Sequence, residues 1–324
     1  MSRVFVALAL ASVCTASAAH ADTFPSKSIT IMPLISAGTG LDVTVRMYAE
    51  QMAQSLGKPV VVENKPGSAG LVGIAALKAA PPDGHTLAVT TSAVMAIRPT
   101  LLKHVPYDVA KDFVPIAIYV KSPFILVVDP KLPIHSVADF IAYIRARPGQ
   151  LSYSSPGIGG APQLAMEFLK QRFGLDIAHV PYRNSPQAIA DIAAGHVATA
   201  FAEAGASLPL IRAGKLRALA VSSTTRLPTV PELQPIGEAI GAPDLEAVSW
   251  HVLLALSGTP PVIVDRLHGE MKRLWAVPAN RERTAALGLL PIDIGSIDEM
   301  RNYIKSENEK WGALVRRLGL EGSQ

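Results

Sequence analysis

Residues 29–63 read ITIMPLISAGTGLDVTVRMYAEQMAQSLGKPVVVE, and their pattern changes three times. The apolar residues 29–32 predict a strand, and a Gly-rich turn follows over residues 33–41. Apolar side chains then recur at helical spacing, with Asp42 placed to cap the start of the helix and Gly57 its end. The closing Val-Val-Val-Glu run predicts a second strand. The stretch therefore predicts a β-α-β unit.

The same alternation continues to residue 90. Residues 69–79 predict a helix of small side chains between two turns, and residues 86–90 predict a third strand. Strands that are joined by helices in this order lie parallel in one sheet. We therefore expect a βαβαβ unit at the start of the fold.

A second alternation begins after a break near residue 120. Two apolar runs, 116–120 and 124–128, are separated by Lys121-Ser122-Pro123, which predicts a chain crossing between two lobes. Further helices and strands are expected at residues 137–146, 151–153, 163–173, 177–180, 186–194, 197–201 and 216–221. A Pro- and Gly-rich segment before the apolar run 248–255 predicts the return crossing. Helices are expected last at residues 261–275, 279–287 and 297–318.

These patterns predict an α/β protein of two lobes joined by two hinge crossings. Residues 22–122 and 245–324 would form lobe 1, and residues 123–244 would form lobe 2. Each lobe is expected to hold a mainly parallel sheet flanked by helices. Ligands of open α/β sheets bind outside the carboxyl ends of the strands, so a cleft between the lobes is the expected binding site.

Composition excludes several classes of protein. The chain has 324 residues, of which 49% are hydrophobic and 17% charged, so it is neither disordered nor a coiled coil. The formal net charge is only +4, and it does not arise from basic clusters, so nucleic acid is not an expected partner. The single cysteine excludes a disulfide framework and a Cys-based metal site.

The N-terminus has the pattern of a secretory signal. A short basic start precedes the apolar run 4–11, and Ala19-His20-Ala21 is a small-x-small cleavage site. We expect residues 1–21 to be removed by cleavage after Ala21 and the mature protein to lie in the periplasm. The apolar run is too short to span a membrane. Cleavage would also remove the single cysteine, Cys14.

Two loops are candidates for holding an anion. The first, Pro33 to Asp42, joins a strand to a helix, and its glycines let a ligand approach the unpaired N–H groups at the helix start. The alternative is a tight turn that Asp42 caps. The second, Ser154 to Gly160, follows a strand in the other lobe and offers hydroxyl groups and exposed amides, although it could equally be a polar connection. A dinucleotide fingerprint is not complete, because Val43 stands where a third glycine is needed.

Catalytic constellations are scarce. The chain has no G-x-S-x-G, G-x-x-x-x-G-K or H-E-x-x-H motif, and its histidines are scattered. His179 and His251 are interpreted as packed side chains. Arg98 and Arg183 could pair with a substrate carboxylate, although arginines on solvated loops are also common.

The sequence resembles a known family, the substrate-binding proteins of tripartite tricarboxylate transporters, also called the Bug family. The resemblance covers essentially the whole mature chain. It rests on residues 57–67 (GKPVVVENKPG), 80–87 (APPDGHTL), 105–108 (VPYD), 179–183 (HVPYR), 213–221 (AGKLRALAV) and 258–260 (GTP).

The resemblance implies a type II periplasmic-binding-protein fold without cofactor, metal or catalytic residues. It implies a monomer that closes on a small di-, tri- or aromatic carboxylate and delivers it to the large and small membrane subunits of the transporter. The candidate binding residues are Ser36, Ala37, Gly38, Thr39, Gly40, Asp42, Ser92, Ser154, Ser155, Gly157, Gly159, Gly160, Tyr182, Arg183, Asn184, Ala202 and Glu203. The chain departs from the family pattern at Thr39, which separates two glycines, at Arg98, and at Ala202-Glu203, where relatives often have Asp after Phe.

Two other functions fit the same sequence less well. A periplasmic sensor could use the same cleft to present its ligand to a membrane sensor kinase, and the sequence does not separate it from a transport protein. A secreted hydrolase on an α/β scaffold is disfavoured, because the nucleophile elbow is missing.

Overall fold

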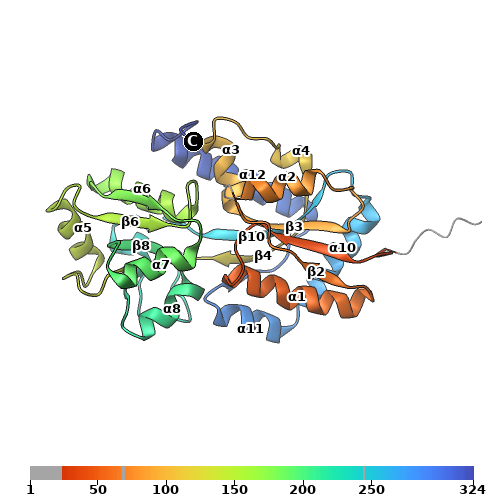
Figure 1. Cartoon of the computed structure of the whole chain (residues 1–324), viewed down its shortest axis with the longest axis horizontal. Helices are drawn as coiled ribbons and strands as arrows, with labels where there is room; N and C mark the ends of the chain where they lie inside the picture. The colour runs from red at the N-terminus through yellow and green to blue at the C-terminus, as the bar shows by residue number, and fades with distance from the viewer. Residues whose placement is uncertain (1–23, 68–69, 244) are drawn as a thin grey trace, which may run out of the picture.

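The computed structural model describes residues 24–67, 70–243 and 245–324. In Figure 1 the chain forms two lobes side by side, each with a sheet between helices. The predicted signal segment, residues 1–21, lies outside the described residues. No helix in the described part of the chain combines the length and the hydropathy needed to cross a bilayer.

The first lobe holds a six-stranded sheet in the order β11-β4-β10-β3-β1-β2. Its strands are β1 (Ile29–Pro33), β2 (Val60–Val62), β3 (Thr86–Thr91), β4 (Phe113–Ser122), β10 (Ser249–Leu256) and β11 (Leu290–Pro291). The helices of this part of the chain are α1 (Gly40–Leu56), α2 (Leu71–Lys78), the π-helix η2 (Ala93–Ile97), α3 (Arg98–Leu101), α4 (Val109–Asp112), α10 (Pro261–Trp275), α11 (Pro278–Ala286) and α12 (Ile297–Arg317).

The second lobe holds a five-stranded sheet in the order β7-β6-β8-β5-β9. Its strands are β5 (Phe124–Val128), β6 (Ser152–Ser155), β7 (Ala178–Pro181), β8 (Thr199–Glu203) and β9 (Arg217–Val221). Its helices are α5 (Val137–Arg145), α6 (Ala161–Phe173), α7 (Ser185–Ala194), α8 (Ala204–Arg212) and α9 (Ile236–Ala239).

The predicted α/β class with two lobes is confirmed, but both sheets are mixed where mainly parallel sheets were expected. In the first sheet β1 pairs in parallel with β2 and β3, whereas β10 runs antiparallel to both β3 and β4. In the second sheet β5 runs antiparallel to β8 and β9. The physical reason is the two crossings, because a strand that enters a sheet from the other lobe arrives in the opposite direction to the local β-α-β strands.

The chain crosses between the sheets twice. Pro123 separates β4 from β5, and residues 222–248 lead back from β9 to β10. Lys121, near the end of β4, forms an ion pair with Glu246 in the return crossing, and its Nζ atom lies 3.0 Å from Glu246 Oε1. The last helix also reaches both lobes, because the Arg317 guanidinium lies 5.1 Å from the ring centroid of Phe168 on α6. Three segments therefore connect the lobes.

The larger hydrophobic core contains buried residues of both sheets, among them Ile31 of β1 and Tyr153 of β6. Near the crossings, a buried carboxylate holds two aromatic side chains of this core. Glu307 on α12 accepts hydrogen bonds from the indole nitrogens of Trp250, 2.9 Å away, and Trp311, 3.0 Å away. Because both indole N–H groups are satisfied, the tryptophans can be buried here at low cost.

The ends of the predicted helices lie within two residues of their expected positions, except at the start of the first helix. Gly57 ends α1 in the left-handed conformation, as expected. The N-cap of α1 is Thr39 and not Asp42: the Thr39 hydroxyl accepts from the N–H of Asp42. The sequence prediction was wrong because Thr39, like Asp42, is a capping residue, and the helix begins three residues earlier than the apolar pattern suggested.

Candidate functional site

A cavity of about 150 Å³ lies between the two sheets. It corresponds to roughly ten water molecules, which is the size of a small solute. Most of its lining residues lie at or just after the ends of β1 and β3 in the first lobe and of β6, β7 and β8 in the second. These are the carboxyl ends of the parallel strands of both lobes, where open α/β sheets bind ligands.

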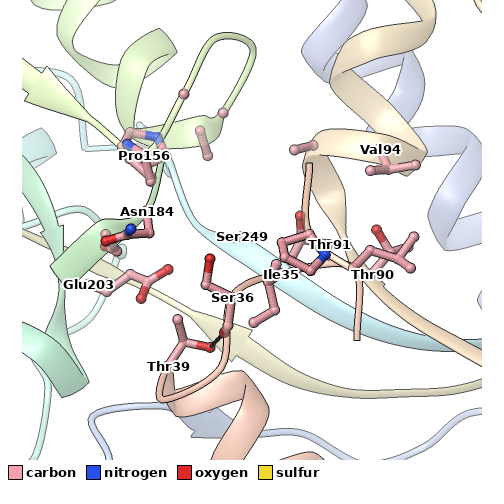
Figure 2. A pocket seen from close by; sticks show the side chains of 18 of the residues that line it. Ile35, Ser36, Thr39, Thr90, Thr91, Val94, Pro156, Asn184, Glu203 and Ser249 are labelled. Carbon is pink, nitrogen blue, oxygen red and sulfur yellow. Dashed lines mark hydrogen bonds between the residues drawn. The ribbon is translucent and has the colours of Figure 1, made fainter. Parts of the chain in front are cut away.

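The first loop contributes Ser36 and Thr39 to the cavity wall. The Thr39 hydroxyl donates to the carbonyl oxygen of Ser36, 3.3 Å away, and this bond is drawn in Figure 2. Thr39 is buried and caps α1, so the start of α1 lies beside the cavity. The partial positive charge of a helix N-terminus favours an anion there.

Asp42 stabilises the first loop through hydrogen bonds and does not line the cavity. Its carboxylate accepts hydrogen bonds from the Gly38 N–H at 3.0 Å, from Arg46 at 3.1 Å and from Asn64 at 2.9 Å. Burial raises the pKa of Asp42, but the bonds from Arg46, Gly38 and Asn64 outweigh it, so the net pKa is lowered. The charge that would repel an anionic ligand is therefore neutralised within the loop.

Arg98 is a buried cation in the part of the cavity wall that the first lobe forms. Its Nη2 atom donates to the carbonyl oxygen of Ile158 in the second lobe, 3.2 Å away. Its Nη1 atom is buried and has no hydrogen-bond partner among the residues that the structure describes. Burial lowers the pKa of Arg98 to about 10, so the guanidinium is still charged at neutral pH. A buried charge without a counter-ion costs several kcal/mol, which a ligand carboxylate would offset.

The loop after β6 forms the facing wall, with Pro156, Gly157, Ile158 and Gly160 on the cavity. Side chains behind it fix its shape. The Ser155 hydroxyl donates to the Gly157 carbonyl at 2.7 Å and lies 2.7 Å from Nε2 of His179. The Gly159 N–H donates to the side chain of Gln163 at 2.7 Å.

The remaining polar groups of the second lobe are Arg183, Asn184, Ser185 and Glu203. Figure 2 shows the side chains of Asn184 and Glu203 on the opposite side of the cavity from Thr90, Thr91 and Val94. Burial raises the pKa of Glu203 to about 7, and a hydrogen bond with Ser185 opposes this rise. Glu203 is therefore poised between its neutral and its ionised form near neutral pH.

The structure brings seven of the predicted binding residues to the cavity: Ser36, Thr39, Gly157, Gly160, Arg183, Asn184 and Glu203. The other ten lie behind or beside the lining: Ala37, Gly38, Gly40, Asp42, Ser92, Ser154, Ser155, Gly159, Tyr182 and Ala202. Several have other partners. Tyr182 donates to Asp191 at 2.6 Å, and the Ser154 hydroxyl donates to the Ala188 carbonyl at 3.2 Å. The Ser92 hydroxyl is hydrogen-bonded to the hydroxyl of Ser249, 3.1 Å away, and Ser249 does line the cavity.

Sequence reasoning missed the polar groups that β3, β4 and β10 supply, namely Thr90, Thr91, Ser122 and Ser249. These residues lie in or at the ends of apolar strands, where the sequence signal is that of a core. His251 on β10 also lines the cavity, and burial lowers its pKa to about 3, so its ring is neutral. No cluster of three or more metal-ligating side chains is found in the described part of the chain.

Two sheets of mixed strands, two crossings and a cavity between the strand ends define a two-lobed periplasmic binding protein. Residues 44–320 match the family described as "Tripartite tricarboxylate transporter family receptor", and the chain belongs to that family. It is a family of periplasmic solute-binding receptors and not of enzymes.

Known proteins are similar to the chain over nearly its whole length. Protein BugT of Bordetella pertussis is 33% identical over 315 residues, which are 97% of this chain and 96% of the relative. The solved structure of Rpa4515 from R. palustris with adipate has a TM-score of 0.86 and 30% identity, and the match covers 91% of this chain and 98% of that one. MatC from Rhodopseudomonas palustris with bound malate has a TM-score of 0.82 and 25% identity over 90% of this chain and all of that one. The predicted Bug-family membership is confirmed.

Proposed function

We propose that this protein captures a small carboxylate in the cavity between its lobes and delivers it to the membrane subunits of a tripartite tricarboxylate-type transporter. Arg98 is the observation that carries the proposal. A guanidinium that lines the cavity and has no acidic partner in the described part of the chain would attract a ligand carboxylate. The related structures with adipate and malate support the same class of ligand.

Capture requires no bond to be made or broken. Both lobes contribute to the cavity, so a ligand that contacts both stabilises the closed arrangement by its differential affinity for the closed and open states. The start of α1 and Arg98 would hold the carboxylate, and the loop after β6 would cover it from the second lobe.

Thermal denaturation with a panel of carboxylates tests the proposal. Citrate, malate, adipate, benzoate and nicotinate cover the candidate classes, and one that binds should raise the melting temperature in proportion to occupancy. Titration calorimetry then gives the affinity, and the recovered ligand should be chemically unchanged. If no acid in the panel binds, or if a product appears, the proposal is wrong.

Localisation and lobe boundaries belong to the same proposal. We place cleavage after Ala21, lobe 1 in residues 22–122 and 245–324, and lobe 2 in residues 123–244. The distribution of strands between the two sheets supports this division. N-terminal sequencing of the exported protein tests the cleavage site, and light scattering tests the expected monomer. Loss of carboxylate uptake when the membrane subunits are deleted would support delivery to a transporter.

A further inference from the structure

The charged side chains of the cavity are separated along its length. Arg98 lies on the side of Val94: a Cβ atom at Gly70 would be 2.9 Å from Val94 Cγ2 and 3.7 Å from Arg98 Nη1. Figure 2 shows Glu203 on the far side from Val94, with its carboxyl group directed into the cavity. A bound solute would therefore meet a cation at one end and an acid at the other.

Within residues 24–67, 70–243 and 245–324, no basic side chain forms an ion pair with Glu203, and Ser185 is its hydrogen-bond partner. A second, smaller space on its other side is lined by apolar or neutral residues of α1, β4, β10, α8 and the segment 287–289. His251 is the one titratable group among them, and its ring is neutral. Within the main cavity the charged groups besides Glu203 are Arg98 and Arg183, and Arg183 is exposed to solvent. The acid is thus available to a ligand.

We infer that Glu203 selects, among small carboxylates, those whose far end carries a hydrogen-bond donor such as a hydroxyl or ammonium group, and disfavours dicarboxylates. The inference rests on the proposed function, because it assumes that the near end of the ligand is a carboxylate held by Arg98 and the first loop. Glu203 would then be the residue that determines specificity at the far end.

The selection follows from charge. An ionised Glu203 accepts a strong, charge-assisted hydrogen bond from a donor. A second ligand carboxylate in the same place is a like charge, and two carboxylates that share a site must also share a proton. A dicarboxylate therefore binds only with uptake of a proton by Glu203, whereas an ammonium group keeps Glu203 ionised.

The two ligand types give opposite pH dependences. The free carboxyl has a pKa of about 7. An ammonium ligand lowers this pKa, so its affinity falls as the pH drops below about 7 and is constant above it. A dicarboxylate raises the pKa, so its affinity is constant below about 7 and falls above it, by up to about tenfold per pH unit for one linked proton.

Matched six-carbon ligands test this directly in the mature protein. We would measure dissociation constants for adipate, hexanoate, 6-hydroxyhexanoate and 6-aminohexanoate between pH 5.5 and pH 8.5, with proton uptake taken from calorimetry in two buffers. At pH 8 we expect 6-aminohexanoate to bind roughly tenfold or more tightly than adipate. The matched variant Glu203→Gln, which is neutral and of the same shape, should lose this preference and both pH dependences.

The control is Glu238→Gln, an exposed acid of the second lobe that should change neither property. Equal affinity for adipate and 6-aminohexanoate, or the same pH profile in Glu203→Gln as in the wild type, would overturn the inference while leaving carboxylate capture intact. If Glu203→Gln does not fold, the wild-type proton count decides, because adipate binding without proton uptake above pH 7 contradicts the proposal. Failure of all four acids and of the wider carboxylate panel would remove the proposed function, and the inference with it.

Discussion

Arg98 illustrates how a single buried charge can define a ligand class. A guanidinium in the interior is unfavourable unless its donors are satisfied, and here one donor is used by the Ile158 carbonyl of the opposite lobe. That contact links Arg98 to closure, because it joins the first lobe to the loop that covers the cavity. In the proposed site, the same side chain therefore serves both the ligand and the contact between the lobes.

Replacing Arg98 by Met should separate ligand binding from stability. A hydrogen bond to a charged group contributes about 1.5 to 3 kcal/mol, so carboxylate affinity should fall roughly 10- to 150-fold. The melting temperature of the ligand-free protein should stay the same or rise, because a buried charge is exchanged for an apolar side chain of similar length. Calorimetry and thermal denaturation measure the two effects.

Arg212→Met, on the exposed end of α8, is the control and should change neither quantity. Arg183 also lines the cavity but is exposed, so Arg183→Met should lower affinity by no more than a few-fold, and less at high salt. An Arg98→Met protein that binds its carboxylate as tightly as the wild type would contradict the role of Arg98.

Asp42 should matter for stability more than for ligand contact. Its carboxylate has three donors in the folded protein, so Asp42→Asn should lower the free energy of unfolding at pH 7 by about 1 to 3 kcal/mol. Because the folded pKa lies below the unfolded value, this contribution is present above about pH 4 and is lost as the pH falls through the folded pKa. Urea unfolding of both proteins from pH 7 to pH 2.5 measures the difference.

The two unfolding curves should therefore converge in acid. Asp265→Asn, an exposed change on α10, should run parallel to the wild type throughout. A constant difference between wild type and Asp42→Asn down to pH 2.5 would show that the carboxylate charge is not what stabilises the loop.

Sequence reasoning named residues that line the cavity where they end a strand or follow one in a loop, as for Ser36, Asn184 and Glu203. It failed where the function of a residue depends on which strand becomes its neighbour. Ser249 lies in an apolar run, and only the return crossing places it 3.1 Å from Ser92. No local pattern carries that information, because the pairing joins segments more than 150 residues apart.

Among the elements, the loop after β6 is the one that closes the cavity, and its packing depends on a glycine. Gly159 has a φ of +76°, and a Cβ atom there would lie 2.5 Å from Leu101 Cδ2 on α3 of the first lobe. A side chain at this position would therefore force the buried Leu101 side chain, or the loop, to shift. The close approach exists only while the lobes are together.

Gly159→Ala should thus hinder closure. Alanine adds a contact between the lobes that is too short, so we expect ligand affinity to fall by tenfold or more, as roughly 1 to 3 kcal/mol of overpacking implies. The matched control is Gly174→Ala, at the end of the helix that follows the same loop. Gly174 also has a positive φ, of +61°, but a Cβ there meets no atom within 4 Å.

Both alanine variants bear the strain of a left-handed residue, which costs about 1 kcal/mol. Both should therefore melt at a lower temperature, and only Gly159→Ala should bind ligand more weakly. Equal affinities in calorimetry would mean that the closed state does not require this approach.

Helix and strand prediction was most accurate for long, regular elements such as α10 and α12. The elements it missed are η2, α3, α4, α8, α9 and β11, which are short or lack a clear period. Residues 93–101 form a π-helix followed by one turn that contains Pro99, and neither has the apolar spacing of an α-helix. This irregular segment carries Arg98, so the candidate ligand-binding residue lies where the sequence gives no clear prediction of secondary structure.

At the scale of the whole molecule, the larger hydrophobic core joins the lobes. It includes buried residues of β1, β6 and β10. Helix α12 adds contacts at two places: Glu307 accepts hydrogen bonds from two tryptophans, and the Arg317 guanidinium lies against the ring of Phe168 in the second lobe. A lobe that lost its partner would expose part of this core to water. Two lobes in one core should therefore unfold together.

We expect one cooperative transition in urea for the ligand-free protein. All three tryptophans are at positions 250, 275 and 311, in β10, α10 and α12, so fluorescence reports on the first lobe, whereas far-ultraviolet circular dichroism reports on both. The two signals should give the same midpoint, and a bound ligand at 100 times its Kd should raise the free energy of unfolding by about 2.7 kcal/mol for both. A fluorescence change that is complete before the circular dichroism change would instead mean that the second lobe is stable alone, because the contacts along α12 would then add too little to couple the lobes.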